Sequence, residues 1–305
     1  MNIKNKMPLV PPRLVQGDTI GIVAPASPFN VDKFYRGIAV LESMGFHLLI
    51  SDDLFIKKGY LAGTDIQRAD MVNKFFSDQK INAIICARGG FGTIKMLSFL
   101  DLQSIQKNPK VFIGFSDISS LLSVLYTKCG IICFHGPTVT TLADATEETQ
   151  KRLLLTITSN SKQEINPKEG VTIKPGEASG PIFVGNLTTL CHLVGTPYTP
   201  RFKGHILIIE EKGEAVYRID RMLSQMKLAG CFEGINGLAL GSFEDCGKLD
   251  EIYEVMEETF RRDNIPILSG FEIGHGKTNI TVPIGSVATL DAKRQRLTFH
   301  EPAVS

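Results

Sequence analysis

The sequence lacks the features that mark membrane, secreted and nucleic-acid-binding proteins. No apolar run in its 305 residues is long enough to cross a bilayer. The N-terminal stretch is basic but has no apolar core, so it does not resemble a secretion signal. The formal net charge is only +1, and lysine and arginine are scattered, which argues against a polyanion-binding surface. We therefore expect a cytoplasmic protein that binds neither membranes nor nucleic acids.

Clusters of metal-binding residues are also lacking. None of the six cysteines belongs to a C-x-x-C pair, and no cysteine and histidine group has the spacing of metal ligands. We expect six free thiols in a reducing compartment, no metal site and no cofactor. What the chain does contain is 43% hydrophobic residues, enough for one large or two ordinary domains.

The first half of the chain alternates short apolar strands with helices. Strands are predicted at 19–25, 47–50, 81–87, 111–113 and 131–134, and helices at 31–44, 65–76, 93–100 and after 117. This order indicates an α/β domain with a parallel sheet, in which ligands bind beyond the carboxyl ends of the strands. Four loops should therefore gather at one edge: 24–28, 88–92, 115–117 and 135–137.

The second half is predicted to be a mixed α+β domain and not a repeat of the first. A polar, turn-rich segment sets the boundaries: a domain at 1–158, a linker at 159–175 and a second domain at 176–305. Strands are expected at 180–184, 205–210 and 237–241, and helices at 186–194, 217–229 and 250–263. The tail from 279 to 300 alternates apolar and polar residues, as antiparallel strands do.

A strand-to-helix turn at Gly114–Asp117 places Ser116 where nucleophiles are often found. A serine on such an elbow is held out from the backbone, beside helix N–H groups that can stabilise an oxyanion. The G-x-S-x-G pattern of hydrolases is only half met, because Ile118 replaces its second glycine. The alternative is that Ser116 is an ordinary helix cap.

The glycine loop Arg88–Gly92 has three possible interpretations. Its glycines could let a phosphate approach a helix, although the pattern is neither G-x-G-x-x-G nor a P-loop. They could instead bring backbone N–H groups close to an oxyanion, or simply form a tight turn. Arg88 could pair with a substrate carboxylate near this loop, or it could only pin the loop through a structural ion pair.

A serine nucleophile needs a base. His275 is the first candidate, because it stands between two glycines in a loop after an apolar strand. His135 is the second candidate, in a loop at the predicted active edge. Either residue could equally be a hydrogen-bonded loop histidine without a catalytic role.

The base needs an orienting acid, and three glutamates lie close together in the sequence. Glu210 ends an apolar strand and should be rigid and half desolvated, whereas Glu211 opens a turn and should be more mobile and more solvated. Glu214 should form a local ion pair with Arg218. The alternative is that Glu210 and Glu211 are solvated acids that pair with Arg218 or Arg221.

Several short motifs occur in an order that resembles the LD-carboxypeptidase family of serine peptidases, which also holds the microcin C immunity peptidases. They are Gly17–Ser27, Arg88–Gly92, Gly114–Asp117, His135–Pro137, Gly185–Leu187, Leu193–Pro197, Ile209–Glu210 with Tyr217–Arg221, and Gly274–Gly276. The resemblance covers almost the whole chain. Phe91 and Phe115 stand where the family commonly has tyrosine, a departure that should leave a catalytic triad intact.

This resemblance implies a two-domain serine carboxypeptidase with its nucleophile at Ser116, its base at His275 and its acid at Glu210. The oxyanion hole would consist of the backbone amides of Gly90 and Asp117. The implied reaction removes the terminal D-alanine from muropeptide tetrapeptides in peptidoglycan recycling, with a small peptide as partner. We expect a homodimer. One alternative is an immunity-type peptidase that hydrolyses peptidyl or acyl-sulfamoyl nucleotides, and another is an inactive binding module.

Overall fold

The computed structural model describes residues 8–305 and divides into two compact units. The first unit holds the chain up to residue 160 together with 280–283 and 303–305, and the second holds 161–279 and 284–302. The basic N-terminal stretch, which we do not expect to be a secretion signal, lies partly outside the described residues. Within residues 8–305, no helix has the length and apolar character needed to span a membrane.

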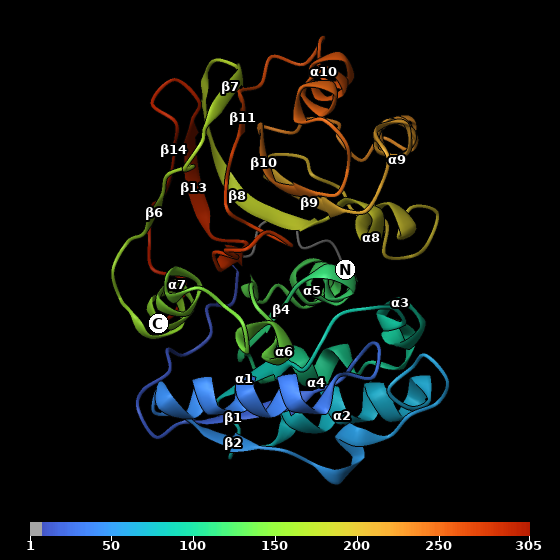
Figure 1. Ribbon diagram of the computed structural model, residues 1–305, viewed down its shortest axis with the longest axis vertical. Coiled ribbons are helices and arrows are strands. Elements are labelled where there is room, and N and C mark those ends of the chain that lie inside the picture. The colour runs from blue at the N-terminus through green and yellow to red at the C-terminus, as the bar shows by residue number, and fades with distance from the viewer. Residues whose placement is uncertain (1–7) are drawn as a thin grey trace. The chain divides into compact units, whose positions relative to one another are not determined.

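A six-stranded sheet forms the centre of the first unit (Figure 1). Its order is β12-β5-β4-β3-β1-β2, and β1 to β5 run parallel. The strands are β1 Thr19–Val23, β2 His47–Leu49, β3 Ala83–Cys86, β4 Val111–Gly114, β5 Cys133–His135 and β12 Val282–Ile284. The parallel sheet predicted for the first half is confirmed, with β12 added from the C-terminal tail.

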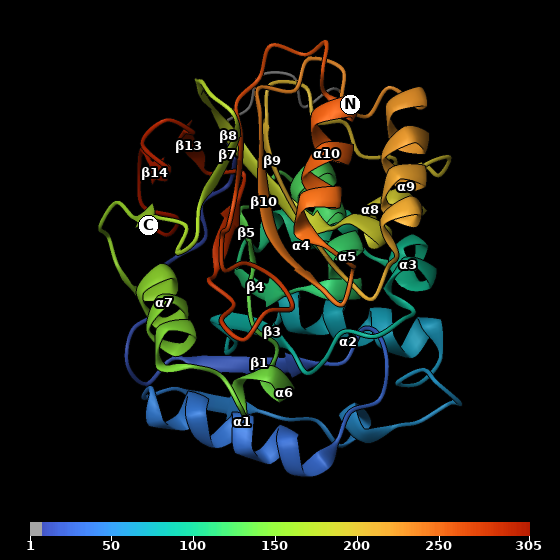
Figure 2. The same cartoon turned by 45° about the horizontal axis from the view of Figure 1, so that its top comes forward.

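The helices predicted at 31–44, 65–76, 93–100 and after 117 are confirmed to within a few residues. The helices of the first unit are α1 Val31–Ser43, η1 Asp52–Phe55, α2 Asp65–Ser77, α3 Thr93–Met96, η2 Leu97–Phe99, α4 Leu102–Lys107, η3 Ser116–Ile118, α5 Ser119–Val124, η4 Leu125–Cys129, α6 Val139–Leu142 and α7 Glu147–Thr158. Of these, η1, α4, α6 and α7 are additional to the prediction. Thr64 caps the start of α2, since its hydroxyl accepts a hydrogen bond from the Gln67 N–H. Helices α1 and α6 pack together (Figure 2).

The strand order of the first sheet places three loops side by side. The order of strand addition reverses at β1, because β2 lies on one side of it and β3, β4 and β5 follow on the other side. Open α/β sheets bind ligands at such a switch point in strand order. Strand β1 leads into Ala24–Pro28, β3 into Arg88–Gly92, and β4, paired with β3, into the turn at Ser116. A fourth loop joins them, since the Gly136 N–H donates to the Gly114 carbonyl over 3.1 Å. The predicted gathering of loops at one edge is confirmed.

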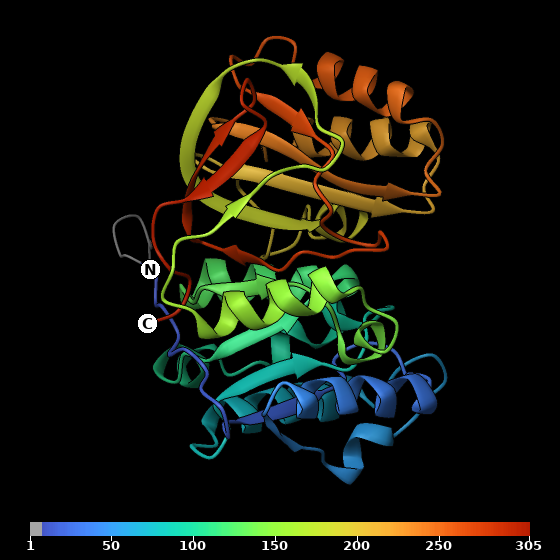
Figure 3. The ribbon, with the colours of Figure 1, turned by 60° about the vertical axis from the view of Figure 1, so that its left-hand side comes forward.

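An eight-stranded mixed sheet forms the second unit, in the order β6-β14-β13-β8-β9-β10-β11-β7. Strands β8 to β11 run parallel at its centre, and the outer strands pair antiparallel. The strands are β6 Glu164–Ile165, β7 Val171–Lys174, β8 Glu177–Asn186, β9 Ile206–Lys212, β10 Gly237–Glu244, β11 Ile267–Ser269, β13 Val287–Asp291 and β14 Arg296–Phe299. The helices are α8 Leu187–His192, α9 Val216–Leu228 and α10 Leu249–Thr259. Helices α9 and α10 lie side by side (Figure 3).

The mixed second domain is confirmed, but two boundaries differ from the prediction. The segment 159–175 is not a plain linker, because β6 pairs with β14 and β7 pairs with β11. Polar, partly exposed residues suit a strand at the edge of a sheet, and in sequence they look like a loop. In addition, residues 280–283 and 303–305 return to the first unit.

Candidate active site

Ser116 lies on a sharp turn between β4 and η3. Its φ of +65° is in the left-handed region, which costs a non-glycine residue energy and is typical of a nucleophile elbow. The capping position before η3 is occupied by Phe115. The interpretation of Ser116 as an ordinary helix cap therefore does not describe this turn.

Asp117 connects this elbow to the glycine loop. Its buried carboxylate accepts a hydrogen bond of 2.8 Å from the Thr93 N–H, at the start of α3. The glycine loop also approaches the elbow directly, since a Cβ placed at Gly89 would lie 2.9 Å from the Cβ of Ser116. The nucleophile candidate and the glycine loop are thus packed against each other within the first unit.

Gly90 occupies a position that only glycine fits. Its φ is +113°, and a Cβ there would lie 2.6 Å from the Cβ of Ser27. Ser27 holds the loop on both sides, because its N–H donates to the Gly89 carbonyl and its Oγ accepts the Phe91 N–H. Within residues 8–305 the exposed Gly90 N–H donates to no acceptor, so it is available to an oxyanion.

Arg88 is exposed and pins one loop to another. Its Nη1 donates to the carbonyl oxygen of Pro28 over 2.8 Å. Arg88 therefore does pin the glycine loop, as one interpretation expected. It does so through a hydrogen bond to a backbone carbonyl and not through an ion pair. Only one of the five N–H donors of a guanidinium is used in this bond. The proposed role of Arg88 in binding a substrate carboxylate stays a prediction.

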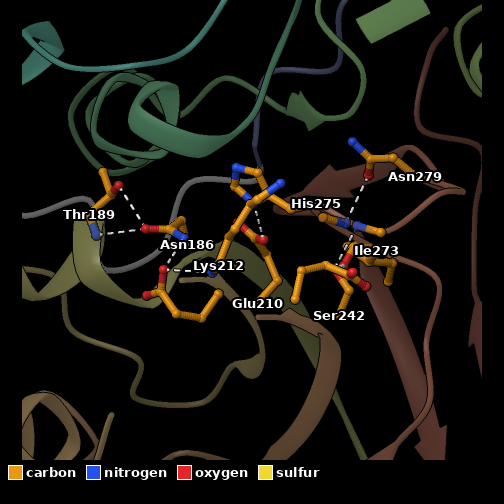
Figure 4. Close-up of polar contacts among 12 residues, drawn as sticks. Asn186, Thr189, Glu210, Lys212, Ser242, Ile273, His275 and Asn279 are labelled. Atoms are coloured by element: carbon orange, nitrogen blue, oxygen red, sulfur yellow. Dashed lines mark hydrogen bonds and ion pairs between the residues drawn. The ribbon is translucent and has the colours of Figure 1, made fainter. Parts of the chain in front are cut away.

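In the second unit, His275 and Glu210 form a hydrogen-bonded pair (Figure 4). The distance between His275 Nδ1 and Glu210 Oε2 is 2.6 Å. The Glu210 side chain is completely buried on β9, and that of His275 is 18% exposed. An acid that accepts the Nδ1 proton fixes the imidazole tautomer and leaves Nε2 as the basic nitrogen. Of the three acidic candidates, Glu210 is the one that contacts His275.

The loop around His275 is fixed on both sides of the imidazole. The Gly274 N–H donates to Asn279 Oδ1 and the Gly276 N–H donates to Ser242 Oγ, each over 3.0 Å (Figure 4). Gly274 has a φ of +108°, and a Cβ there would lie 2.6 Å from Glu210 Cγ. Glycine therefore lets the acid lie directly beneath the loop that carries the histidine.

Glu211 is buried, and the prediction that it is mobile and solvated is wrong. Its Oε1 accepts hydrogen bonds from Asn186 Nδ2 and the Lys212 N–H, each over 2.9 Å, and its Oε2 accepts one of 2.7 Å from the Thr188 N–H. Burial raises the pKa of the Glu211 carboxyl, although these N–H donors act in the opposite direction. Both faces of β9 are buried from Ile206 to Glu211. Glu211 is therefore hidden from solvent although its side chain points to the face opposite that of Glu210.

The other candidates are also placed by the structure. Glu214 forms the expected ion pair with Arg218, at 3.3 Å. Glu210 and Glu211 are buried, so the interpretation of them as solvated partners of nearby arginines is wrong. His135 is not a loop residue but the last residue of β5, where it is fully buried with its ring against Phe115.

Two family models match the chain in order. The model described as the LD-carboxypeptidase N-terminal domain matches residues 20–136, and the LD-carboxypeptidase C-terminal domain matches residues 179–290. The chain belongs to the LD-carboxypeptidase family.

Individual relatives in this family carry two kinds of name. The probable murein peptide carboxypeptidase of Bacillus subtilis is 35% identical over 292 residues, covering 92% of this chain and 91% of that protein. The microcin C7 self-immunity protein MccF of Escherichia coli is 31% identical over 336 residues, covering 98% and 97%. A crystal structure of an MccF-like protein from Bacillus anthracis has a TM-score of 0.91 at 27% identity, covering 95% and 99%.

Several residues that shape this LD-carboxypeptidase site were not found from sequence. Ser242 and Asn279 hold the His275 loop through hydrogen bonds to its backbone, which no motif marks. The sequence marks Ser27 only as a loop residue. Arg68 did leave a signal, because it lies four residues before Val72 on the buried face of α2.

Proposed function

We propose that this chain is a serine-type LD-carboxypeptidase that removes the terminal D-alanine from muropeptide tetrapeptides. The observation that carries the proposal is the elbow of Ser116, a strained serine at the carboxyl edge of a parallel sheet in a member of this family. We place the reaction in the cytoplasm, as a step of peptidoglycan recycling.

In the proposed mechanism, Ser116 Oγ attacks the carbonyl carbon of the peptide bond to D-alanine, and His275 Nε2 takes the serine proton. Glu210 accepts the Nδ1 hydrogen and stabilises the imidazolium. The amides of Gly90 and Asp117 bind the oxyanion of the tetrahedral intermediate. The intermediate then collapses as His275 protonates the leaving amine of D-alanine, and water hydrolyses the acyl-enzyme by the same route.

The cysteines support a serine rather than a thiol nucleophile. All six are buried, and burial raises the pKa of the Cys86 thiol well above its usual range and that of Cys191 to about 11. Thiols in such surroundings keep their proton at neutral pH and react slowly. Ser116 is therefore the better candidate.

Hydrolysis of a peptidyl or acyl-sulfamoyl nucleotide is the second candidate function. Its support is the 31% identity with MccF over nearly the whole chain. The alignment lengths favour the murein substrate. The alignment with MccF extends over 336 positions, more than the 305 residues of this chain, so MccF has insertions that this chain lacks. The alignment with the murein peptide carboxypeptidase extends over 292 positions, fewer than the residues of this chain. An inactive binding module is disfavoured, because the chain contains both the hydrogen-bonded His275–Glu210 pair and the Ser116 elbow.

The test is to incubate the protein with a muropeptide tetrapeptide and measure released D-alanine, with an aminoacyl-sulfamoyl nucleoside as the competing substrate. Release of D-alanine with little cleavage of the nucleoside is expected, and the reverse preference would favour the second candidate. Ser116→Ala should keep the fold and lose about a million-fold in turnover, or somewhat less. A folded variant that kept about a tenth of the activity would show that Ser116 is not the nucleophile.

A further inference from the structure

A buried arginine lies at the base of the glycine loop. Arg68 belongs to the first turn of α2, and its side chain is 1% exposed. Its Nη1 donates to two backbone carbonyls, those of Pro25 and Gly92, and its Nη2 pairs with the carboxylate of Asp65. Burying a cation is costly unless its charge and its N–H groups are matched. Here the match is made by the Asp65 carboxylate, by the Pro25 carbonyl and by the carbonyl of Gly92, the last residue of the glycine loop, while among residues 8–305 Arg68 Nε has no hydrogen-bond partner.

The bond to Gly92 leads directly to the nucleophile elbow. In a planar trans peptide the C=O and N–H groups point in opposite directions. The Gly92 carbonyl accepts from Arg68 over 2.8 Å, and the Thr93 N–H of the same peptide unit donates to Asp117 Oδ2 over 2.8 Å. A single peptide unit thus connects the buried guanidinium to Asp117, whose own amide is one proposed oxyanion donor.

The bond to Pro25 leads to the other proposed donor, Gly90. The loop that contains Pro25 also contains Ser27, whose N–H donates to the Gly89 carbonyl over 3.4 Å. Ser27 Oγ accepts the Phe91 N–H over 3.1 Å, so this loop holds Gly90 from both neighbouring residues. Arg68 therefore fixes the segments that orient both proposed oxyanion donors.

We infer that Arg68 is a positioning residue for the oxyanion hole, which sets the directions of the Gly90 and Asp117 amides without touching the substrate. This inference rests on the proposed serine mechanism. Removing an oxyanion donor typically costs about 100- to 1,000-fold in kcat, and misplacing reacting groups by about 1 Å costs up to about 100-fold. Arg68→Lys keeps the charge but loses the planar fork that reaches both carbonyls. We expect it to lower kcat about 10- to 100-fold with KM within about twofold, because the amides act on the transition state.

The control variant is Arg36→Lys in the same unit. Arg36 also combines a backbone carbonyl with a carboxylate, donating to Ala143 O over 3.2 Å and pairing with Asp144 at 2.7 Å, but it is 54% exposed. For each variant we would measure urea unfolding, kcat and KM for D-alanine release, and the rate at which a fluorophosphonate labels Ser116. In that labelling Ser116 Oγ displaces fluoride from phosphorus, so no peptide substrate is required. If Arg68→Lys fails to fold, Asp65→Asn weakens the same interaction and takes its place.

Slower labelling and lower kcat at unchanged KM in Arg68→Lys, with Arg36→Lys like the wild type, would support the inference. The fold-decrease in kcat of the double variant Arg68→Lys/Asp117→Ala should also be smaller than the product of the two single decreases, since both residues act through one peptide unit. A lower unfolding free energy with an unchanged labelling rate and kcat would overturn it, because Arg68 would then be only structural. A wild type that is labelled at Ser116 but releases no D-alanine would refute the proposed substrate, and the labelling rates alone would then decide on Arg68. A wild type that is not labelled would overturn both.

Discussion

Replacing Glu211 with alanine should destabilise the second unit strongly. The Glu211 side chain is 2% exposed and accepts hydrogen bonds from the Asn186 amide and from the N–H groups of Thr188 and Lys212. Alanine removes the acceptor of two donors at the junction of β8 and α8, Asn186 and Thr188, and of the Lys212 N–H at the end of β9. The same Asn186 side chain caps α8 by accepting the Thr189 N–H over 3.0 Å, so the start of that helix should loosen as well.

Two opposing effects set the magnitude. A buried donor left without an acceptor costs about 1–3 kcal/mol, and this cost applies in full to the Asn186 amide. The N–H groups of half-buried Thr188 and exposed Lys212 should cost less, because water can reach them. Removing a buried charge also removes its desolvation penalty, which is the reason why the pKa of Glu211 is raised. We expect a net loss of about 2–3 kcal/mol, because the alanine variant leaves neutral N–H donors and no unpaired charge. Glu214→Ala is the control, since it breaks a half-exposed i,i+4 pair with Arg218 that is worth about 0.3–0.5 kcal/mol.

The assay is urea unfolding followed by far-UV circular dichroism, because the chain has no tryptophan to report by fluorescence. Unfolding free energies of the Glu211 and Glu214 variants that agree within about 1 kcal/mol would refute the reasoning. Glu211→Gln adds a test of sign. A raised pKa means that the folded state holds the proton more tightly, so this contribution to stability is present below the ordinary pKa of 4.5 and declines as pH rises. The wild type should therefore lose stability relative to Glu211→Gln between pH 4.5 and 7.

Three further outcomes are expected. Glu210→Gln should keep the circular dichroism spectrum and lower the kcat for D-alanine release by about 10⁴-fold, because an amide cannot hold the His275 tautomer in the same way; activity above a tenth of wild type would contradict this. Arg88→Lys should raise KM strongly for the tetrapeptide, and amidating the substrate carboxylate should no longer weaken binding in this variant; an undiminished amide penalty would reject the binding role. Prolonged chelation should leave turnover unchanged, since residues 8–305 hold no group of three or more His, Cys, Asp or Glu side chains suited to a metal, whereas loss of activity restored by zinc would refute the serine mechanism.

The first sheet could be predicted from sequence because its strands are short, fully buried apolar runs between turn signals. Strand β3 is buried at every residue, and so is β4. Strand β7, in contrast, is exposed or half-buried along its whole length and pairs with β11 nearly a hundred residues away. Neither its composition nor its neighbours in sequence indicate that pairing, which depends on tertiary structure alone.

The candidate site divides in the same way. Ser116 and His275 could be proposed because glycines and a strand-to-helix turn surround them, and those patterns have local physical causes. The residues that hold them in place could not. Ser242, Asn279 and Arg68 act through hydrogen bonds to backbone groups, and a bond to a backbone group requires no particular residue as its partner. Sequence patterns therefore predict the reacting residues better than the residues that orient them.

Glu210 and Glu211 show why two adjacent acids on one buried strand can have different roles. Their side chains point to opposite faces of β9, and both are hidden from water, so each must find its own partners. The Glu211 carboxylate accepts from three N–H groups, which compensate its charge in part, although burial still raises its pKa. Glu210 Oε2 contacts His275, and among residues 8–305 its Oε1 accepts no hydrogen bond. In the proposed mechanism His275 takes a proton from Ser116, and the Glu210 carboxylate then contacts a cation. Such a carboxylate stabilises the transition state more than the resting state, which is the property that raises kcat.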